Sequence, residues 1–138
     1  MKLFLSILLT AAFITAGYAQ ENPERVKRIE ALKAAFITKK LDLNPDEAKS
    51  FWPVYNNYQN EITSLVKQKK LNRSENKGKP EEALDNDMEY DTKMVDVKKK
   101  YRKEFSKVLP AQKVLELYNA EREFREELIR ELRERHKE

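Results

Sequence analysis

The sequence contains no cysteine, one histidine and two glycines among its 138 residues. Without cysteine the fold cannot depend on disulfides, and thiolate metal sites are excluded. The single histidine, His136, stands near the end of the chain, where a frayed segment cannot hold a general base in position. The carboxylates lack metal-ligand spacing, such as that of an EF-hand loop. We therefore expect no enzyme, no metal site and no cofactor.

Long apolar runs are also absent, apart from one between residues 3 and 14. Lys2 precedes this run, and Gly17 and Ala19 place small residues at the −3 and −1 positions of a signal peptidase site. The run is short for a membrane span, and a retained membrane anchor is the alternative. No cysteine follows it, which excludes a lipoprotein. The pattern predicts a signal peptide over residues 1–19, cleavage after Ala19 and export to the periplasm.

What remains, residues 20–138, has the length of one domain. Charged residues make up 38% of the whole chain and hydrophobic residues 40%. This mixture suits a thin bundle of amphipathic helices. The net charge of +4 is small for a nucleic-acid-binding protein, and with an export signal present we expect no nucleic acid among the partners. After cleavage the chain is not expected to span a membrane.

Four of the five prolines stand where helices begin, because proline costs no hydrogen bond at the first helical position. Asn22 and Asn44 precede two of them as natural N-caps. Apolar residues then repeat at steps of three and four in each segment. The pattern predicts an all-α, elongated four-helix antiparallel bundle or hairpin. Its helices span about 23–41, 45–72, 80–107 and 110–136, with a flexible tip at 73–79.

The fifth proline, Pro53, follows the only tryptophan, Trp52, inside the second predicted helix. An internal proline removes a hydrogen bond and clashes with the preceding turn. We predict that Pro53 kinks the helix and gives the bundle a concave face. The alternative is that Pro53 restarts the helix after one capped turn.

Two helix starts also resemble each other in sequence. Each places an apolar residue two positions before a proline and a Glu or Gln four positions after that apolar residue. Two similar helix caps would explain the same pattern. The residues are Leu43, Asn44, Pro45 and Glu47 in the first copy, and Val108, Pro110 and Gln112 in the second.

These starts resemble the LTxxQ motif of the Spy/CpxP superfamily of periplasmic proteins. The segments "ITKKLDLNPDEAKSFWPVYNNYQNE" and "VLPAQKVLELYNAEREFREEL" are similar to the Bacteroidetes branch often labelled "sensor of ECF-type sigma factor". The resemblance covers nearly the whole chain after the leader. It implies a protein of the envelope stress response, and a homodimeric cradle that holds unfolded clients.

Nine cations form two clusters near the ends of the second and third predicted helices. One explanation of these clusters is that cations near a helix C-terminus interact favourably with the helix dipole and stabilise the helix. The other is a positive surface that attracts acidic, partly unfolded clients or an anionic lipid surface, with nearby aromatic rings as apolar contacts. The residues of this predicted surface are Lys67, Lys69, Lys70, Arg73, Lys98, Lys99, Lys100, Arg102, Lys103, Phe51, Trp52 and Tyr55.

The sequence therefore favours an ATP-independent holdase chaperone or an envelope-stress adaptor, with unfolded or envelope proteins as partners. A regulatory partner of an envelope signalling or sigma-factor system, without chaperone activity, is the alternative. A purely structural, coiled-coil-like module is the third hypothesis.

Overall fold

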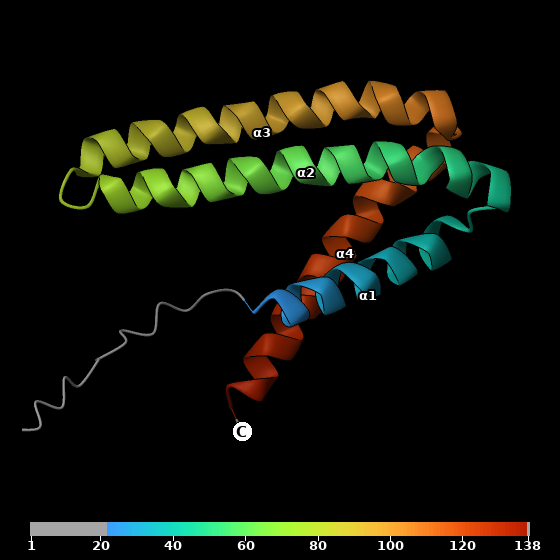
Figure 1. The fold of residues 1–138 in the computed structure, drawn as a ribbon, viewed down its shortest axis with the longest axis horizontal. Coiled ribbons are helices and arrows are strands. Elements are labelled where there is room, and N and C mark those ends of the chain that lie inside the picture. The colour runs from blue at the N-terminus through green and yellow to red at the C-terminus, as the bar shows by residue number, and fades with distance from the viewer. Residues whose placement is uncertain (1–21, 138) are drawn as a thin grey trace, which may run out of the picture.

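The computed structural model describes residues 22–137, which form four α-helices joined by short turns (Figure 1). The prediction of an all-α protein is confirmed, and the described part of the chain contains no strand. The predicted signal peptide, residues 1–19, lies outside the described residues. The helices are α1 (Pro23–Leu41), α2 (Pro45–Glu75), α3 (Pro80–Val108) and α4 (Ala111–Arg135).

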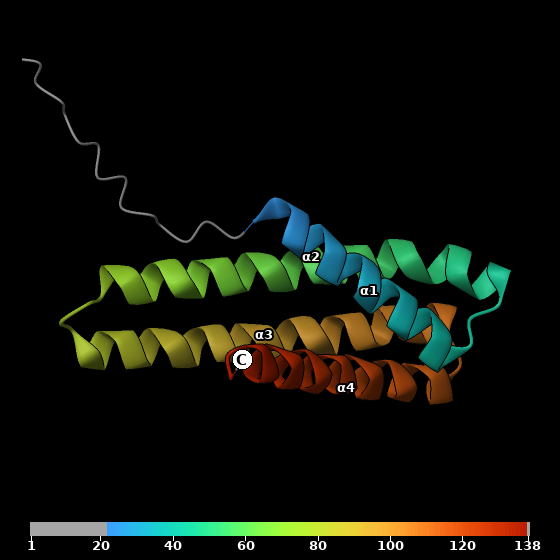
Figure 2. The ribbon, with the colours of Figure 1, turned by 90° about the horizontal axis from the view of Figure 1, so that it is seen from below.

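The longest helices, α2 and α3, lie side by side as an antiparallel hairpin, whereas α1 and α4 pack on each other (Figures 1 and 2). The turns α1–α2 and α3–α4 meet at one end of the hairpin, which we call the corner end. The turn α2–α3 forms the opposite end, the tip. From the corner end α1 and α4 run back along the hairpin at an angle to it.

Side-chain caps fix the starts of α1 and α2. The Asn22 side chain accepts a hydrogen bond from the backbone N–H of Glu24 at 3.1 Å. Asn44 accepts from the N–H of Glu47 at 2.8 Å, and the Glu47 carboxylate accepts from the N–H of Asn44 at 3.3 Å. This reciprocal pair is a capping box, and it confirms Asn44 as the N-cap of α2.

The later boundaries differ from the prediction. α2 continues to Glu75, so Arg73 belongs to the helix, and the tip shrinks to residues 76–79, where Gly78 takes a φ of 84°. α4 begins at Ala111, with Pro110 just before its first turn. Gln112 does not cap α4, because its side chain donates to Glu116 at 3.3 Å.

The core gathers at the corner end. The buried residues come only from 37–58 and 101–120, and none of residues 59–100 is buried. The corner end is a helix junction covered on several sides, whereas towards the tip the hairpin consists of two helices alone. The fully buried side chains are Ile37, Leu41, Phe51, Phe105 and Leu117.

One lysine ties the two similar helix starts together. Lys113, in the first turn of α4, donates to the Asp42 carbonyl at 2.8 Å and to the Glu47 carboxylate at 2.8 Å. The hydrogen bond from Lys113 lowers the pKa of the Glu47 carboxyl below its ordinary value. The two starts that resemble each other in sequence are therefore adjacent in space.

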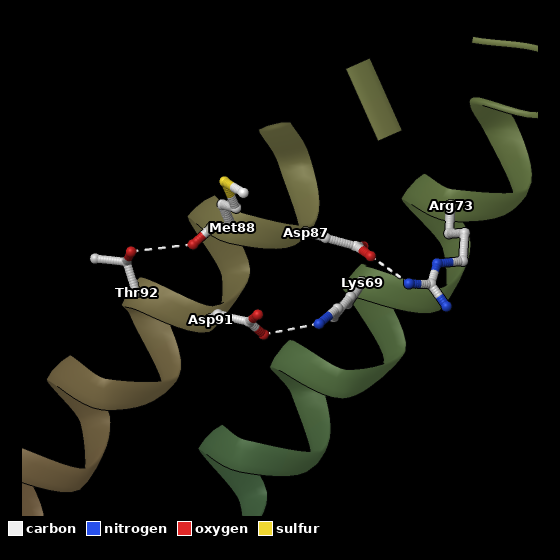
Figure 3. A network of polar contacts seen from close by, with 6 residues as sticks. All are labelled: Lys69, Arg73, Asp87, Met88, Asp91 and Thr92. Carbon is white, nitrogen blue, oxygen red and sulfur yellow. Dashed lines mark hydrogen bonds and ion pairs between the residues drawn. The ribbon is translucent and has the colours of Figure 1, made fainter. Parts of the chain in front are cut away.

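Polar contacts hold the tip half of the hairpin. Figure 3 shows Lys69 of α2 paired with Asp91 of α3 at 2.7 Å, and Arg73 paired with Asp87. Next to the second pair, Asn86 donates to the Asn72 side chain at 2.8 Å. Such exposed pairs contribute little energy each, so their main effect is to fix the register of the two helices.

Pro53 lies within an unbroken α2. The alternative that it restarts the helix is therefore wrong. Both Pro53 and Lys49, whose carbonyl loses its helical donor, are exposed, so water can satisfy that carbonyl. In Figure 1 the hairpin is gently bowed, with its concave side facing α1 and α4, and α3 shares this bow. A sharp kink at Pro53 itself stays a prediction.

Candidate functional site: the pocket between the hairpin and α1–α4

A pocket of about 330 Å³ lies where the hairpin faces α1 and α4. All four helices contribute to it, so its shape depends on how the two helix pairs are set against each other. We call it the cradle pocket. Its lining residues are Ile29, Lys33, Tyr58, Gln59, Ile62, Met94, Lys98, Tyr118, Glu121, Arg122, Phe124, Arg125 and Leu128.

The apolar wall of the cradle pocket comes from both helix pairs. Ile62 and Met94 line it from the hairpin, and Ile29, Phe124 and Leu128 line it from α1 and α4. All five side chains are half-buried rather than buried. They belong to the apolar repeats at steps of three and four, which predict the helix faces that a bundle buries. The structure instead leaves them facing a space that no other helix of residues 22–137 fills.

The carboxylate of Glu121, whose side chain is 15% exposed, forms the polar part of this site. Glu121 Oε1 accepts hydrogen bonds from Tyr55 Oη and Gln59 Nε2, both at 3.1 Å. Lys33 donates to Gln59 at 3.0 Å, and its Nζ lies 4.0 Å from the Glu121 carboxylate. This network joins α1, α2 and α4. The i,i+4 spacing of Glu121 and Arg125 predicts a salt bridge on a solvated face. For Glu121 this prediction is wrong, because its side chain is 15% exposed and accepts hydrogen bonds from α2.

Burial sets the ionisation of this network. It raises the pKa of the Glu121 carboxyl, against the opposing attraction of Lys33. Burial also lowers the pKa of the Lys33 ammonium, and the attraction of Glu121, which acts in the opposite direction, offsets only part of this shift. Burial raises the pKa of the Tyr55 and Tyr58 phenols far above their ordinary values, so both act as neutral donors at any physiological pH.

Cations border the pocket. Lys98 of α3 and Arg122 and Arg125 of α4 line it and are exposed. With Lys33 they make four cationic lining residues against one carboxylate, Glu121. Such an arrangement favours an acidic ligand, because clefts lined by one sign of charge concentrate the opposite charge.

Of the predicted basic surface, only Lys98 belongs to this pocket. Three of the other cations are paired with carboxylates of the neighbouring helix, which is a structural role. They are Lys69 with Asp91, Arg73 with Asp87, and Lys100 with Glu61.

The remaining predicted cations lie elsewhere. Lys67 and Lys70 are exposed on α2. Lys99, Arg102 and Lys103 line a separate pocket of about 600 Å³ on α3, together with Ser106. The nine cations thus do not form one surface.

The aromatic part of the predicted surface needs correction. Phe51 is fully buried and Tyr55 is 4% exposed, because both pack in the ring cluster of the corner end. The Phe51 and Phe105 ring centroids lie 5.7 Å apart. Trp52 is half-buried and lines a separate cleft between α1 and α2. Phe51 and Tyr55 therefore stabilise the fold and cannot contact a client.

Within residues 22–137 no cluster of three or more His, Asp or Glu side chains is placed to hold a metal ion. No described helix combines the length and the apolar character needed to cross a membrane.

Known proteins do not assign this chain to a family. No family model matches it, and no curated protein and no solved structure is significantly similar to it.

Proposed function

We propose that the chain is an exported, periplasmic client-binding protein of the Spy/CpxP type, which holds partly unfolded proteins in the cradle pocket without ATP. The observation that carries this proposal is a concave pocket with apolar walls and a cationic border, built by all four helices. An unfolded segment offers apolar side chains and, when acidic, the complementary charge.

The way the pocket is built also supports a holdase. Its apolar side chains are half-buried, so a client can cover them without the core opening. Its cations stand on exposed helix faces, where charge acts mainly on the rate of encounter. The resemblance of the helix starts to the LTxxQ motif, and the signal peptide pattern, favour the same function and place.

Two adjacent leucine-sized residues of α4 allow a matched test. Leu128 lines the cradle pocket, whereas Ile129 lies outside it and is 43% exposed. We expect Leu128→Asp to weaken protection of an acidic, chemically unfolded client roughly tenfold, which corresponds to about 1.4 kcal/mol. Ile129→Asp should leave protection unchanged, although it introduces the same charge on the same helix.

Light scattering of the aggregating client measures protection, and circular dichroism checks that both variants keep their helices. If the unmodified protein protects no client, the holdase proposal fails. A regulatory partner of an envelope signalling protein would then take its place. Equal loss in both variants would show that the pocket is not where clients bind.

A further inference from the structure

A second cleft lies between α1 and α2, beside the cradle pocket. Because α1 runs back from the corner end at an angle to the hairpin, it leaves space against α2 (Figure 1). This space has a volume of about 380 Å³, within the range of roughly 300–1,000 Å³ that is typical of small-molecule sites. We call it the α1–α2 cleft. Lys33 and Gln59 line both the cleft and the cradle pocket.

The α1–α2 cleft contains the only tryptophan of the chain. Trp52 is half-buried, and its ring centroid lies 4.9 Å from that of Phe51 and 5.5 Å from that of Tyr55. These two core rings hold the indole in place. A tryptophan that packs on the core and also lines a cleft is a rigid apolar contact surface, which loses little conformational freedom when a ligand covers it.

Two asparagines follow Trp52 along the same face of α2. Asn56 and Asn60 stand four and eight residues after it, so both lie on one line of the helix with the indole, and both line the cleft. Each is exposed, and neither side chain forms a hydrogen bond with another residue in the range 22–137. A carboxamide offers two donor hydrogens and one acceptor oxygen. The cleft therefore has polar groups that are free to bind a ligand.

A third carboxamide of the cleft is fixed in orientation. The Gln59 side chain accepts from Lys33 at 3.0 Å and donates to Glu121 at 3.1 Å. These two bonds determine which end of the carboxamide is the oxygen and which is the nitrogen. One N–H of Gln59 and two of Lys33 remain for a ligand. This part of the cleft is thus organised before a ligand binds.

The charges of the cleft balance, unlike those of the cradle pocket. Its lining has one carboxylate, Glu30, and one ammonium, Lys33, about one turn apart on α1. The cleft therefore does not concentrate ions of either sign. A purely apolar ligand is also disfavoured, because it would leave the carboxamides without hydrogen-bond partners. The lining fits a neutral ligand that has one apolar face and many hydrogen-bonding groups.

We propose that the α1–α2 cleft binds a neutral sugar, with a pyranose ring on the Trp52 indole and the sugar hydroxyls hydrogen-bonded to the carboxamides of α2. A pyranose has C–H groups on its faces and hydroxyls around its edge, so one small unit supplies both kinds of contact. A hydroxyl donates and accepts, as a carboxamide does. An extended peptide is also neutral and polar, but only its side chains would cover the indole. The site does not depend on the proposed client binding.

The fluorescence of Trp52 reports on the cleft directly, because the chain has no other tryptophan. The probes are three neutral oligosaccharides, namely cellotriose, maltotriose and the trimer of N-acetylglucosamine. Each is titrated into the whole protein up to about 10 mM, well above a weak Kd of about 1 mM. We expect at least one of them to change the Trp52 emission in a saturable way. No saturable change with any of the three would overturn the proposal.

Variants of neighbouring asparagines give a matched comparison. Asn56→Ala combined with Asn60→Ala should weaken sugar binding at least tenfold. Asn57→Ala should leave it unchanged, because Asn57 is exposed on the same helix but does not line the cleft. Both proteins keep Trp52 as the reporter, and circular dichroism checks that they keep their helices. Equal weakening in both would show that the carboxamides of the cleft do not bind the sugar.

Two further measurements test the ring and the location. Trp52→Leu removes the indole, and calorimetry should then show binding at least tenfold weaker. Leu128→Asp changes only the cradle pocket and should leave sugar binding unchanged. Loss of sugar binding in Leu128→Asp would place the sugar in the cradle pocket and overturn the proposal. Tighter binding of the neutral peptide Gly-Ser-Gly than of any of the sugars would overturn it too, since the cleft would then be a peptide site.

Discussion

At the residue scale, Glu121 is the side chain on which the geometry of the cradle pocket depends most. It is a carboxylate of α4 held by donors from α2, with an ammonium of α1 close by. Two hydrogen bonds to one oxygen compensate part of the desolvation cost of the carboxylate. If one partner is removed, that cost is no longer compensated and the fold is destabilised. No periodicity in the sequence marks Glu121, because it stands among many carboxylates of α4 that face solvent.

This burial predicts a pH dependence that can be isolated. The folded state binds the Glu121 proton more tightly than the unfolded state, because burial raises the pKa of this carboxyl above 4.5. Its contribution to stability is therefore greatest below pH 4.5 and is lost as pH rises through the raised pKa. Glu121→Gln cannot ionise. Relative to the unmodified protein, we expect its free energy of unfolding to increase as pH rises from about 4.5 to 7.

Urea unfolding at several pH values, followed by circular dichroism, measures this difference. Taking the difference between two proteins cancels the opposite contributions of Glu47 and Glu61, whose pKa values are lowered by hydrogen bonds from Lys113 and Lys100. Glu126→Gln, at an exposed position of the same helix, is the matched control and should track the unmodified protein. A difference that stays constant with pH would show that Glu121 is not desolvated.

At the element scale, the starts of α1 and α2 follow from the sequence because capping is local chemistry. An asparagine, a proline and a glutamate at fixed offsets are enough to place the N-terminus of α2. The predicted end of α2 is three residues early, because Arg73 is held in the helix by Asp87 of α3, a partner that the local sequence pattern does not reveal.

The local pattern is also insufficient for Ile62 and Met94, which line the cradle pocket. Their spacing predicts an inward face, but only the tertiary arrangement determines whether another helix covers it.

Replacing Pro53 would show whether the stability and curvature of α2 depend on this one residue. The helix is continuous there and the proline is exposed. Pro53→Ala should therefore restore a hydrogen bond to the Lys49 carbonyl without disturbing the core. We expect the free energy of unfolding to rise by up to about 3 kcal/mol. The gain is smaller if a water molecule already donates a hydrogen bond to the Lys49 carbonyl. Chemical unfolding measures the gain, and solution scattering measures the shape.

We also expect the Pro53→Ala protein to be straighter. If its scattering profile equals that of the unmodified protein, the bow of the hairpin does not come from Pro53. The common bow of α2 and α3 in Figure 1 would then follow from their packing.

At the scale of the whole molecule, the hydrophobic core and the exposed apolar surface lie in different regions. The corner end contains all the buried residues of the described chain, so it supplies most of the hydrophobic stabilisation. The tip half of the hairpin has a polar interface between its helices and apolar residues on its surface. The cradle pocket lies between these two regions. A ligand there would contact both helix pairs without needing the core to open.

The last prediction concerns how clients reach the cradle pocket. Lys98 and Arg125 line it from opposite helix pairs and are exposed, so their attraction for an acidic client is screened over about 8 Å at physiological salt. Raising the salt concentration should therefore slow client capture more than it speeds release. The double variant Lys98→Glu and Arg125→Glu should lower the capture rate at least tenfold at low salt, and added salt should narrow its difference from the unmodified protein.

Stopped-flow fluorescence with a labelled acidic client separates the two rates. Lys67→Glu with Arg133→Glu is the matched control, because it makes the same change in net charge at exposed positions outside the pocket. Equal slowing in both double variants would mean that clients respond to net charge and not to this site. Capture that is insensitive to salt in every protein would mean that the apolar wall acts alone, and that the cations of the border serve solubility.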